Sequence, residues 1–427
     1  MEQQEHSWDA IRAQFPILQQ TVHGKPLVYL DSAATAQKPQ CVIDAESQFY
    51  STINAGVHRG AHELAARSTV AFEQARERIA KFIGASWQEG EEEVVVTAGA
   101  TAGLNLLATA FGYASLGRGG SAATRFALHE GDEIVVSEAE HHSVLLPMQE
   151  LAARTGATLR WIPVTQDGRI DVTRAHEVIT ARTRIVAVTY VTNVTGSITD
   201  VAPIVQAAHQ VGAVVILDAC QAAPHLALDM HALDVDFAAF SAHKMYGPTG
   251  VGFLYGKREL LEALPAATFG GSMVELAWLD KPAQYMAPPA RFEAGTQPIA
   301  QVVASGVAAE FLDHIGFAAI EQHEHALTER LLQLDSIPGV RILGPTENTQ
   351  RIGTVAFEVE GVHPHDVGQF VDAQGVAIRV GHHCAQPIHR HFGVFASNRA
   401  SVGVYNTLSD IDALVDAVSG VRAFFKA

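Results

Sequence analysis

The chain has 427 residues, 48% of them hydrophobic, and a formal net charge of −17 at pH 7. That length allows a large core and favours two domains, while the acidic balance argues against a nucleic-acid or anionic-membrane partner. With only three cysteines, the chain is not expected to have a disulfide framework. It has no apolar stretch of membrane-spanning length, and its N-terminus is polar, without a signal peptide. These features predict a cytoplasmic protein.

The N-terminal part of the sequence predicts two helices. A short helix is expected around residues 8–14, where it could pack on either domain, and residues 67–83 have the spacing of an amphipathic helix that ends at Gly84. Farther on, the segment from Gly112 to Gly131 is rich in small residues and has no strong periodicity. We interpret that segment as a surface loop.

Seven short apolar runs, most of them rich in valine and isoleucine, occupy the first two-thirds of the chain. They are continuous rather than alternating, and helix-length segments separate them. This pattern predicts a mainly parallel, seven-stranded sheet covered on both faces, as in α/β proteins. The runs are residues 94–96, 134–136, 159–164, 185–191, 213–217, 237–240 and 251–255.

The pattern changes after about Pro298. Beyond it the sequence predicts helices at 299–315, 319–334 and 364–373 and strands at 340–343 and 353–359. We therefore expect an N-terminal segment at 1–30, a large domain at 31–298 and a smaller α+β domain at 299–427.

A lysine follows one of the apolar runs in the sequence Phe240-Ser241-Ala242-His243-Lys244. Enzymes that use pyridoxal 5'-phosphate need such a lysine, which binds the cofactor as a Schiff base and is later freed as a base. The chain has only seven lysines, so few residues could take this role. The plainer alternative is a surface lysine at the end of a strand.

An aspartate ends another apolar run. Asp218 is costly to bury unless it is paired, and pairing with the pyridinium nitrogen of the cofactor would meet that need. Lys244 lies 26 residues after Asp218, which leaves room for one helix and one strand. The acid and the amine should therefore lie on adjacent or nearby strand ends. Cys220, two residues after Asp218, is interpreted as a packing residue.

Three further polar segments follow predicted strands. The small residues from Thr97 to Asn105 open a helix and could bind a phosphate, although many such turns bind nothing. His141 could stack on a cofactor ring or move protons, or it could belong to a solvated loop. Asn193 could donate to a ring oxygen or a substrate carboxylate, or it could be a turn residue.

The small domain contributes Cys384 in the sequence Arg379-Val380-Gly381-His382-His383-Cys384. A reactive thiolate needs a partly exposed, electropositive setting, and the neighbouring arginine and histidines could supply one; the alternative is an inert loop cysteine. Arg399 could bind a carboxylate in a bidentate manner or form a surface ion pair. We expect no metal, because the nearby histidines, namely His363, His365, His389 and His391, fit no familiar zinc spacing.

Together these segments resemble the group II cysteine desulfurases, the SufS/CsdA type, of the class V aminotransferase family. The resemblance runs from about Phe15 to Phe425 and implies a fold-type I enzyme that depends on pyridoxal 5'-phosphate and forms a homodimer. Its motifs are residues 29–35, 57–60, 140–142, 240–250, 292–296, 379–385 and 399–401.

The resemblance also implies roles for single residues. The implied cofactor contacts are Lys244 as the Schiff-base amine, His141 stacked on the ring, Asp218 at the ring nitrogen, Gln221 at the ring hydroxyl, Thr101, Ser241 and His243 at the phosphate, and Thr296 at the phosphate of the neighbouring subunit. The implied substrate contacts are Asn193 and Arg399 at the carboxylate, Cys384 as the persulfide-forming nucleophile, and Arg379 close to it.

The implied reaction converts L-cysteine to L-alanine and passes the sulfur from Cys384 to an acceptor, either a protein of the SufE or SufU kind or an iron–sulfur scaffold. A selenocysteine lyase, another C–S lyase or an epimerase of the same family is an alternative, and a non-catalytic assembly scaffold is an alternative from another class. Two motifs depart from the family's pattern. Ala100 and Ala102 stand where the family has a threonine and a glutamate, and Ala219-Cys220 stands where Gly-Ala is usual.

Overall fold

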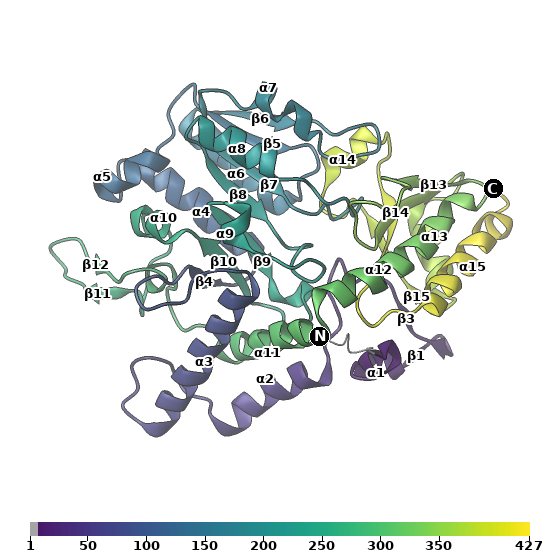
Figure 1. Ribbon diagram of the computed structural model, residues 1–427, viewed down its shortest axis with the longest axis horizontal. Coiled ribbons are helices and arrows are strands. Elements are labelled where there is room, and N and C mark those ends of the chain that lie inside the picture. The colour runs from purple at the N-terminus through teal and green to yellow at the C-terminus, as the bar shows by residue number, and fades with distance from the viewer. Residues whose placement is uncertain (1–6) are drawn as a thin grey trace.

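The computed structural model describes residues 7–427, and a seven-stranded sheet forms its centre (Figure 1). The strand order is β4-β10-β9-β8-β7-β5-β6. Strand β10 runs antiparallel to both of its neighbours, and the other adjacent pairs are parallel. The prediction of a mainly parallel sheet is confirmed. The strands are β4 (Val94–Thr97), β5 (Glu133–Ser137), β6 (Thr158–Ile162), β7 (Thr183–Thr189), β8 (Val214–Asp218), β9 (Phe237–Ser241) and β10 (Gly252–Gly256).

Both faces of this sheet are apolar, which explains why the runs are continuous. Alternate residues of one strand point to opposite faces, and in β8 Val214 and Ile216 belong to one core cluster while Val215 and Leu217 belong to the other. Helices α4 (Ala100–Ser115), α6 (His142–Thr155) and α10 (Arg258–Ala263) contribute to the first cluster. Helices α3 (Glu63–Phe82), α8 (Ala202–Gln210) and α11 (Ile299–Ile315) contribute to the second.

The segment from Gly112 to Gly131 is not the surface loop that we predicted. Helix α4 continues to Ser115, and a short helix α5 (Gly120–Ala123) and a 3₁₀ turn, η2 (Thr124–Phe126), follow it. Phe126 is buried and stacks on Phe111 of α4 at 5.3 Å between ring centroids. The prediction failed because α4 is apolar on most sides, so the sequence has no polar face to mark a helical period.

The C-terminal part forms a smaller sheet of order β13-β14-β17-β16, all antiparallel. It lies with its helices at one end of the molecule, coloured green to yellow in Figure 1. The predicted α+β character is confirmed, although β16 and β17 were not predicted. The elements are β13 (Val340–Leu343), β14 (Thr354–Val359), β16 (Arg379–Gly381), β17 (Ser397–Ser401), α12 (Phe317–Leu331), α13 (Pro364–Asp372), α14 (Gln386–His391) and α15 (Leu408–Phe425).

The N-terminal segment contacts both parts of the chain. Helix α1 (Trp8–Arg12) holds the small domain through Arg12, whose Nη1 donates to Asp410 at 2.8 Å. Phe15 packs edge-on against Tyr246 of the large domain and Tyr405 of the small domain. Strand β3 (Val28–Tyr29) pairs in parallel with β15 (Val376–Ala377). The segment therefore fastens one domain to the other.

Helix α11, which follows Pro298, packs against α2 (Gln40–Thr52) and α3 at the large domain. A methyl group added to Gly306 of α11 would lie 2.9 Å from Cβ of Ala75 on α3, so the two helices approach closely at this glycine. The domain limits given above stay a prediction. Within residues 7–427 no single helix is long and apolar enough to cross a membrane; only the bent pair of Ile299–Ile315 and Phe317–Ser336 passes that test, by length and composition.

Candidate active site

Ten of the twelve predicted site residues line one cavity of about 250 Å³ at the carboxyl edge of the large sheet. Both domains contribute to its wall. The ten are Thr101, His141, Asn193, Asp218, Ser241, His243, Lys244, Arg379, Cys384 and Arg399, and the wall also includes Ala33, Ala34, Ala100, Ser143, Cys220 and His383.

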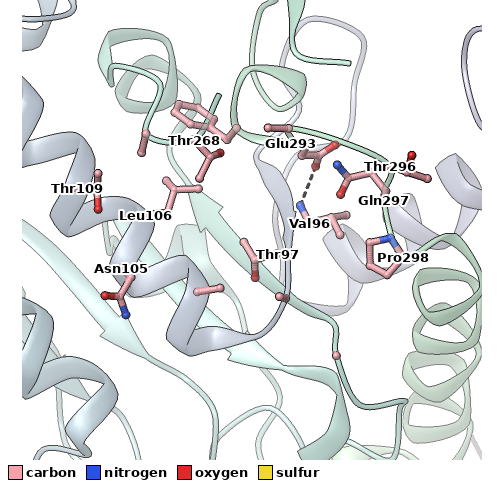
Figure 2. Close-up of a pocket in the computed structure, with 16 residues that line it drawn as sticks. Val96, Thr97, Asn105, Leu106, Thr109, Thr268, Glu293, Thr296, Gln297 and Pro298 are labelled. Carbon is pink, nitrogen blue, oxygen red and sulfur yellow. Dashed lines mark hydrogen bonds between the residues drawn. The ribbon is translucent and has the colours of Figure 1, made fainter. Parts of the chain in front are cut away.

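The other two predicted residues lie elsewhere. Gln221 does not line the cavity, but its Nε2 donates to the carbonyl of Ala33, a residue of the cavity wall, at 2.9 Å. Thr296 lies in a second, larger cavity of about 600 Å³, on the same segment as Glu293 and Gln297 (Figure 2). Within the single chain Thr296 does not join the other ten, so a contact with the neighbouring subunit stays a prediction.

Lys244 is the last residue of a 3₁₀ turn, η4 (Ala242–Lys244), that directly follows β9. The turn is held through the carbonyl of His243, which accepts from the Ala36 N–H at 3.0 Å, the Thr35 hydroxyl at 3.2 Å and Lys38 Nζ at 3.1 Å. Burial, followed by the charges of Lys244 and Lys38, lowers the pKa of His243 to about 4. His243 is therefore a neutral hydrogen-bonding group at neutral pH.

Asp218 ends β8, and β8 pairs directly with β9. The acid and the amine thus come from adjacent strands, as their spacing predicted. Asp218 is 5% exposed, and its Oδ1 accepts the N–H of Cys220 at 2.9 Å. Burial, and then the charge of Asp218, raise the pKa of the Cys220 thiol well above its ordinary value, so Cys220 stays protonated.

His141 caps α6 and has a defined tautomer. Its Nδ1 accepts the N–H of Ser143 at 3.1 Å, so the neutral ring carries its proton on Nε2. Burial, and then the charge of Lys244, lower the pKa of His141 to about 4. A neutral, flat ring at this edge suits stacking on an aromatic cofactor.

Glu140 is a buried carboxyl group to which sequence reasoning gave no role. It is fully buried, and its Oε1 accepts the Ser137 hydroxyl at 2.5 Å and the Thr189 N–H at 3.0 Å. Burial raises the pKa of Glu140 to about 8. The group fixes the loop between β5 and α6, which ends with His141, and only its position directly before His141 could have pointed to it.

The N-terminus of α4 faces the cavity through Ala100 and Thr101. The Ala100 N–H donates to the hydroxyl of Ser241 at 2.9 Å, which places Ser241 beside the first turn of the helix. A helix of 16 residues concentrates unpaired N–H groups and positive potential at this end. Ala100 and Ala102 add no polar side chain, so an anion here would depend on backbone N–H groups, the two hydroxyls of Thr101 and Ser241, and the ring of His243.

Cys384 lies on a loop that the large domain holds by its backbone. The Nδ2 of Asn193 donates to the His383 carbonyl at 2.6 Å, and the His142 N–H donates to the Cys384 carbonyl at 2.7 Å. His383 and Cys384 have left-handed φ values of 49° and 54°, a conformation that costs about 1–3 kcal/mol per residue outside glycine. The two hydrogen bonds offset that cost and hold the exposed thiol at the cavity.

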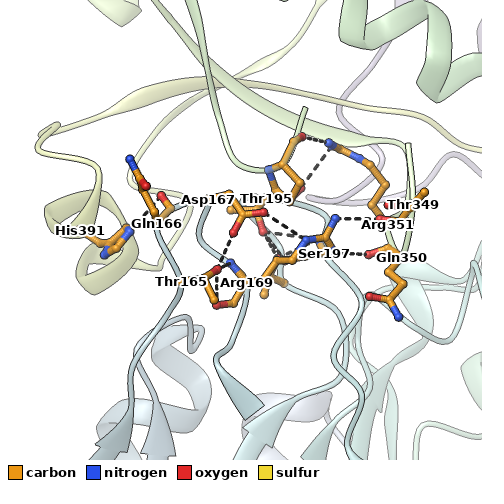
Figure 3. Close-up of polar contacts among 12 residues, drawn as sticks. Thr165, Gln166, Asp167, Arg169, Thr195, Ser197, Thr349, Gln350, Arg351 and His391 are labelled. Atoms are coloured by element: carbon orange, nitrogen blue, oxygen red, sulfur yellow. Dashed lines mark hydrogen bonds and ion pairs between the residues drawn. The ribbon is translucent and has the colours of Figure 1, made fainter. Parts of the chain in front are cut away.

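Two segments of the large domain, one with Arg169 and one with Thr195, are hydrogen-bonded to residues 349–351 of the small domain (Figure 3). Arg169 donates to the carbonyls of Thr349 and Gln350 at 2.8 and 3.0 Å. From the other side, Arg351 donates to the carbonyl of Thr195 at 3.2 Å. These bonds fix the distance between the two domains close to the Cys384 loop.

Two arginines converge on one carboxylate at the rim of the cavity. Arg399 Nη2 lies 3.4 Å from Asp31 Oδ1, and Arg379 Nη1 lies 3.6 Å from Asp31 Oδ2. Burial raises the pKa of Asp31 despite both guanidinium groups. Arg399 also donates to the Asn193 carbonyl at 3.0 Å. Asp31 was not among the predicted site residues, although it belongs to the motif at 29–35 that carried the resemblance.

This donor set fits pyridoxal 5'-phosphate. The cavity offers an amine, a buried carboxylate on the adjacent strand, a neutral flat imidazole and a helix N-terminus. Oε1 of Gln221, which lies outside the lining of the cavity, is buried without a hydrogen-bond partner among the described residues. Among residues 7–427 no cluster of three or more His, Cys, Asp or Glu is placed to hold a metal ion.

The chain is similar to known proteins over almost its whole length. The family model for class-V aminotransferases matches residues 28–414. A probable cysteine desulfurase of Streptomyces coelicolor is 47% identical, with 98% of this chain and 97% of that protein covered. A cysteine desulfurase of Dickeya dadantii is 45% identical, with 95% of each covered.

Solved structures agree with this similarity. The cysteine desulfurase CsdA of Escherichia coli, in an S-sulfonic acid form, superimposes with a TM-score of 0.87 at 38% identity and covers 98% of this chain and 99% of its own. A cysteine desulfurase of Thermococcus onnurineus has the same TM-score at 33% identity, with 96% and 98% covered. The chain therefore belongs to the class-V aminotransferase family.

Proposed function

We propose that this protein is a cysteine desulfurase that uses pyridoxal 5'-phosphate to convert L-cysteine to L-alanine. The observation that carries the proposal is the meeting of Lys244 and Cys384, from different domains, on the wall of one cavity. Three relatives that carry this name are 45–48% identical over nearly their full length.

Substrate binding depends on Arg399 and Asn193. The guanidinium of Arg399 is buried, and its Nε lacks a hydrogen-bond partner among the described residues. A planar guanidinium in this position binds a carboxylate with good geometry. Arg379 is more exposed and brings a second positive charge to the same rim, next to the Cys384 loop.

Four residues of the chain have separate roles in the reaction. The bound cofactor supplies an electron sink for the charge that develops when the α-proton of cysteine leaves. Lys244 moves that proton, Asp218 stabilises positive charge at the ring nitrogen, and His141 covers the ring as a neutral imidazole. The Cys384 thiolate forms an S–S bond with the substrate sulfur while the Cβ–S bond breaks, which leaves a persulfide on Cys384.

The sulfur then leaves from an exposed position. Cys384 is one of two exposed cysteines, and its place on the surface lets an acceptor protein reach the persulfide. A sulfur carrier of the SufE or SufU kind, or an iron–sulfur scaffold, suits this role in the cytoplasm. We also propose a homodimer, in which Thr296 and the larger cavity face the second copy.

The test is mass spectrometry after incubation with L-cysteine. We expect one added sulfur atom on the peptide that contains Cys384, together with free alanine. The variant Cys384→Ser should lose both, whereas Cys41→Ser, at the other exposed cysteine, should keep both. Alanine release without any adduct on Cys384 in the native protein would contradict the proposal.

A further inference from the structure

The start of helix α6 and the Cys384 loop, residues 382–386, exchange hydrogen bonds between the two domains. His142, the first residue of α6, donates its N–H to the carbonyl of Cys384 at 2.7 Å. In the other direction, Nε2 of the same His142 accepts the N–H of Gln386 at 3.3 Å. Gln386 is the first residue of α14. One histidine of the large domain therefore holds the loop on both sides of Ala385.

Both bonds satisfy groups that a helix cannot pair by itself, because the first N–H groups of a helix have no partner within that helix. The residue before α14 is Ala385, whose methyl group offers no acceptor, so α14 has no side-chain cap of its own. The ring of His142 takes the place of that cap. The first N–H of α6 has its acceptor in the Cys384 carbonyl. Each of the two helix starts is thus paired through the other domain.

The ring of His142 must be neutral to accept from Gln386. Because Nε2 accepts, the neutral ring carries its proton on Nδ1, whereas an imidazolium has protons on both nitrogens and can accept nothing. Burial, and then the charge of His382, lower the pKa of His142, so the ring is neutral at neutral pH. The titratable groups that face it are His382 and His141, whose ring centroid lies 6.4 Å away and whose pKa is lowered to about 4. The electrostatic setting therefore favours the accepting form.

The loop needs such contacts from outside. Its internal turn bond runs from the Ala385 N–H to the His382 carbonyl at 2.9 Å, and it encloses the two residues with left-handed φ values, His383 and Cys384. That conformation is unfavourable for both residue types. Asn193 holds the carbonyl before Cys384, whereas His142 holds the carbonyl of Cys384 itself and the N–H that follows Ala385. The position of the thiol therefore depends on His142.

We propose that His142 is the positioning residue that docks the Cys384 loop at the cavity, and that protonation of its ring releases the part of the loop that leads into α14. The proposal deepens the desulfurase function proposed above and rests on it. His142 is not on the cavity wall, so it acts through Cys384. A proton from solvent binds the same Nε2 lone pair that accepts the Gln386 N–H, so protonation and docking compete for one atom.

Hydrogen exchange of the holoenzyme tests the docking without any turnover. Mass spectrometry follows the peptide that contains Gln386. In His142→Phe the ring stays but the acceptor is lost, so we expect this peptide to exchange about tenfold faster at neutral pH, the effect of one typical hydrogen bond. His142→Gln places an amide oxygen near the position of Nε2 and should keep the native exchange. His363→Phe is the matched control, because Nδ1 of His363 also accepts a backbone N–H at a helix start, that of His365 at 3.2 Å, but on the surface.

The pH dependence separates docking by an imidazole from a purely structural role. The same exchange is measured from about pH 8 to about pH 5, the range in which histidines titrate, and is corrected for the intrinsic effect of pH. The native loop should lose protection towards the acid end, because acid favours the undocked form with the higher His142 pKa. The amide of His142→Gln takes up no proton in this range, so its loop should stay protected. Equal pH dependence in these two proteins, or native exchange in His142→Phe, overturns the proposal.

Kinetics connect the loop to the reaction. His142→Phe should lower kcat for alanine formation by about tenfold through a small displacement of the thiol, with KM for L-cysteine unchanged because Arg399 and Asn193 are intact. If His142→Phe does not fold, His142→Asn replaces it, since its shorter amide does not reach Gln386. A native kcat in a variant whose loop exchanges faster would also overturn the proposal. Failure of the desulfurase function is a separate result, because it would appear in the native protein as a lack of alanine and persulfide.

Discussion

The side-chain amide of Asn193 donates a 2.6 Å hydrogen bond to the carbonyl of His383, and it thereby ties the large domain to the loop of the proposed nucleophile. The same residue accepts from Arg399 through its own carbonyl. One asparagine thus contacts both the loop of the thiol and the guanidinium that we propose as the binding group for the substrate carboxylate. His383 and Cys384 both have left-handed backbone conformations, which are unfavourable for these residue types. The position of Cys384 therefore depends on the contact from Asn193 more than on the loop itself.

Replacement of Asn193 by alanine should therefore misplace Cys384. We expect kcat for alanine formation to fall by about tenfold to a hundredfold, since small displacements of a reacting group cost this much. The cofactor's visible absorbance should not change. Asn348→Ala is a matched control, because Asn348 also donates to a backbone carbonyl, that of His325 at 2.9 Å, but on the surface. Equal kcat values in the two variants would refute the role of Asn193.

Lys244 should be the only lysine whose loss removes covalent cofactor binding. Lys244→Ala leaves the cavity without its amine, so we expect no Schiff-base absorbance after addition of pyridoxal 5'-phosphate and reduction by borohydride to label no lysine. Lys257→Ala is the control, because Lys257 also follows a strand but is paired with Asp234 at 2.6 Å. Persistent Schiff-base absorbance in Lys244→Ala would reassign the amine.

Arg399→Lys tests whether the planar guanidinium binds the substrate carboxylate. A lysine keeps the charge but loses the bidentate geometry, so we expect KM for L-cysteine to rise by roughly tenfold or more with a smaller change in kcat. Arg341→Lys is the surface control, since Arg341 pairs with Glu358 at 2.7 Å and is half exposed. A native KM in Arg399→Lys would show that the carboxylate binds elsewhere.

The sequence was sufficient to predict the strands and the strand-end residues. Val214–Leu217 and its equivalents are apolar on both faces, so their runs were unmistakable, and Asp218 and Lys244 stand at fixed positions after them. The helix from Ala100 to Ser115 could not be recognised in the same way. Its residues are mostly small and apolar, so apolar and polar positions do not alternate with the period of a helix. The interpretation of the following segment as a loop was wrong for that reason.

The contacts that join the two domains could not be predicted from the sequence. His383 and Ser397 are 14 residues apart and meet only because β16 and β17 pair, and neither strand was predicted. The contacts of Asn193 and of Arg351 join residues more than 150 positions apart in the chain. Such contacts depend on how the two domains dock, and local patterns carry no signal for that.

Glu140 should make stability depend on pH. In the unfolded chain its carboxyl group ionises near the ordinary value for glutamate, whereas burial raises the pKa of the folded state to about 8. The stability that the protonated carboxyl contributes is fully present below the pKa of Glu140 in the unfolded chain. It is lost as the pH rises from that value to the folded-state pKa of about 8. We expect the free energy of unfolding of Glu140→Gln, minus that of the native protein, to increase by up to about 1.4 kcal/mol per pH unit between about pH 5 and pH 8. Urea unfolding at a series of pH values measures the difference, and a constant difference would contradict it.

Gly306 should be the glycine at which a methyl group is most damaging to the packing of α11 on α3. An added Cβ would lie 2.9 Å from both Cα and Cβ of Ala75, and overpacking of this kind costs about 1–3 kcal/mol. Gly420 in α15 is the matched control, because its added Cβ would meet the ring of Phe370 at an ordinary 3.4 Å. There the better helix propensity of alanine should stabilise the protein by up to about 1 kcal/mol. Urea unfolding of Gly306→Ala and Gly420→Ala should therefore give midpoints on opposite sides of the native value, and a native midpoint for Gly306→Ala would mean that the two helices can separate without cost.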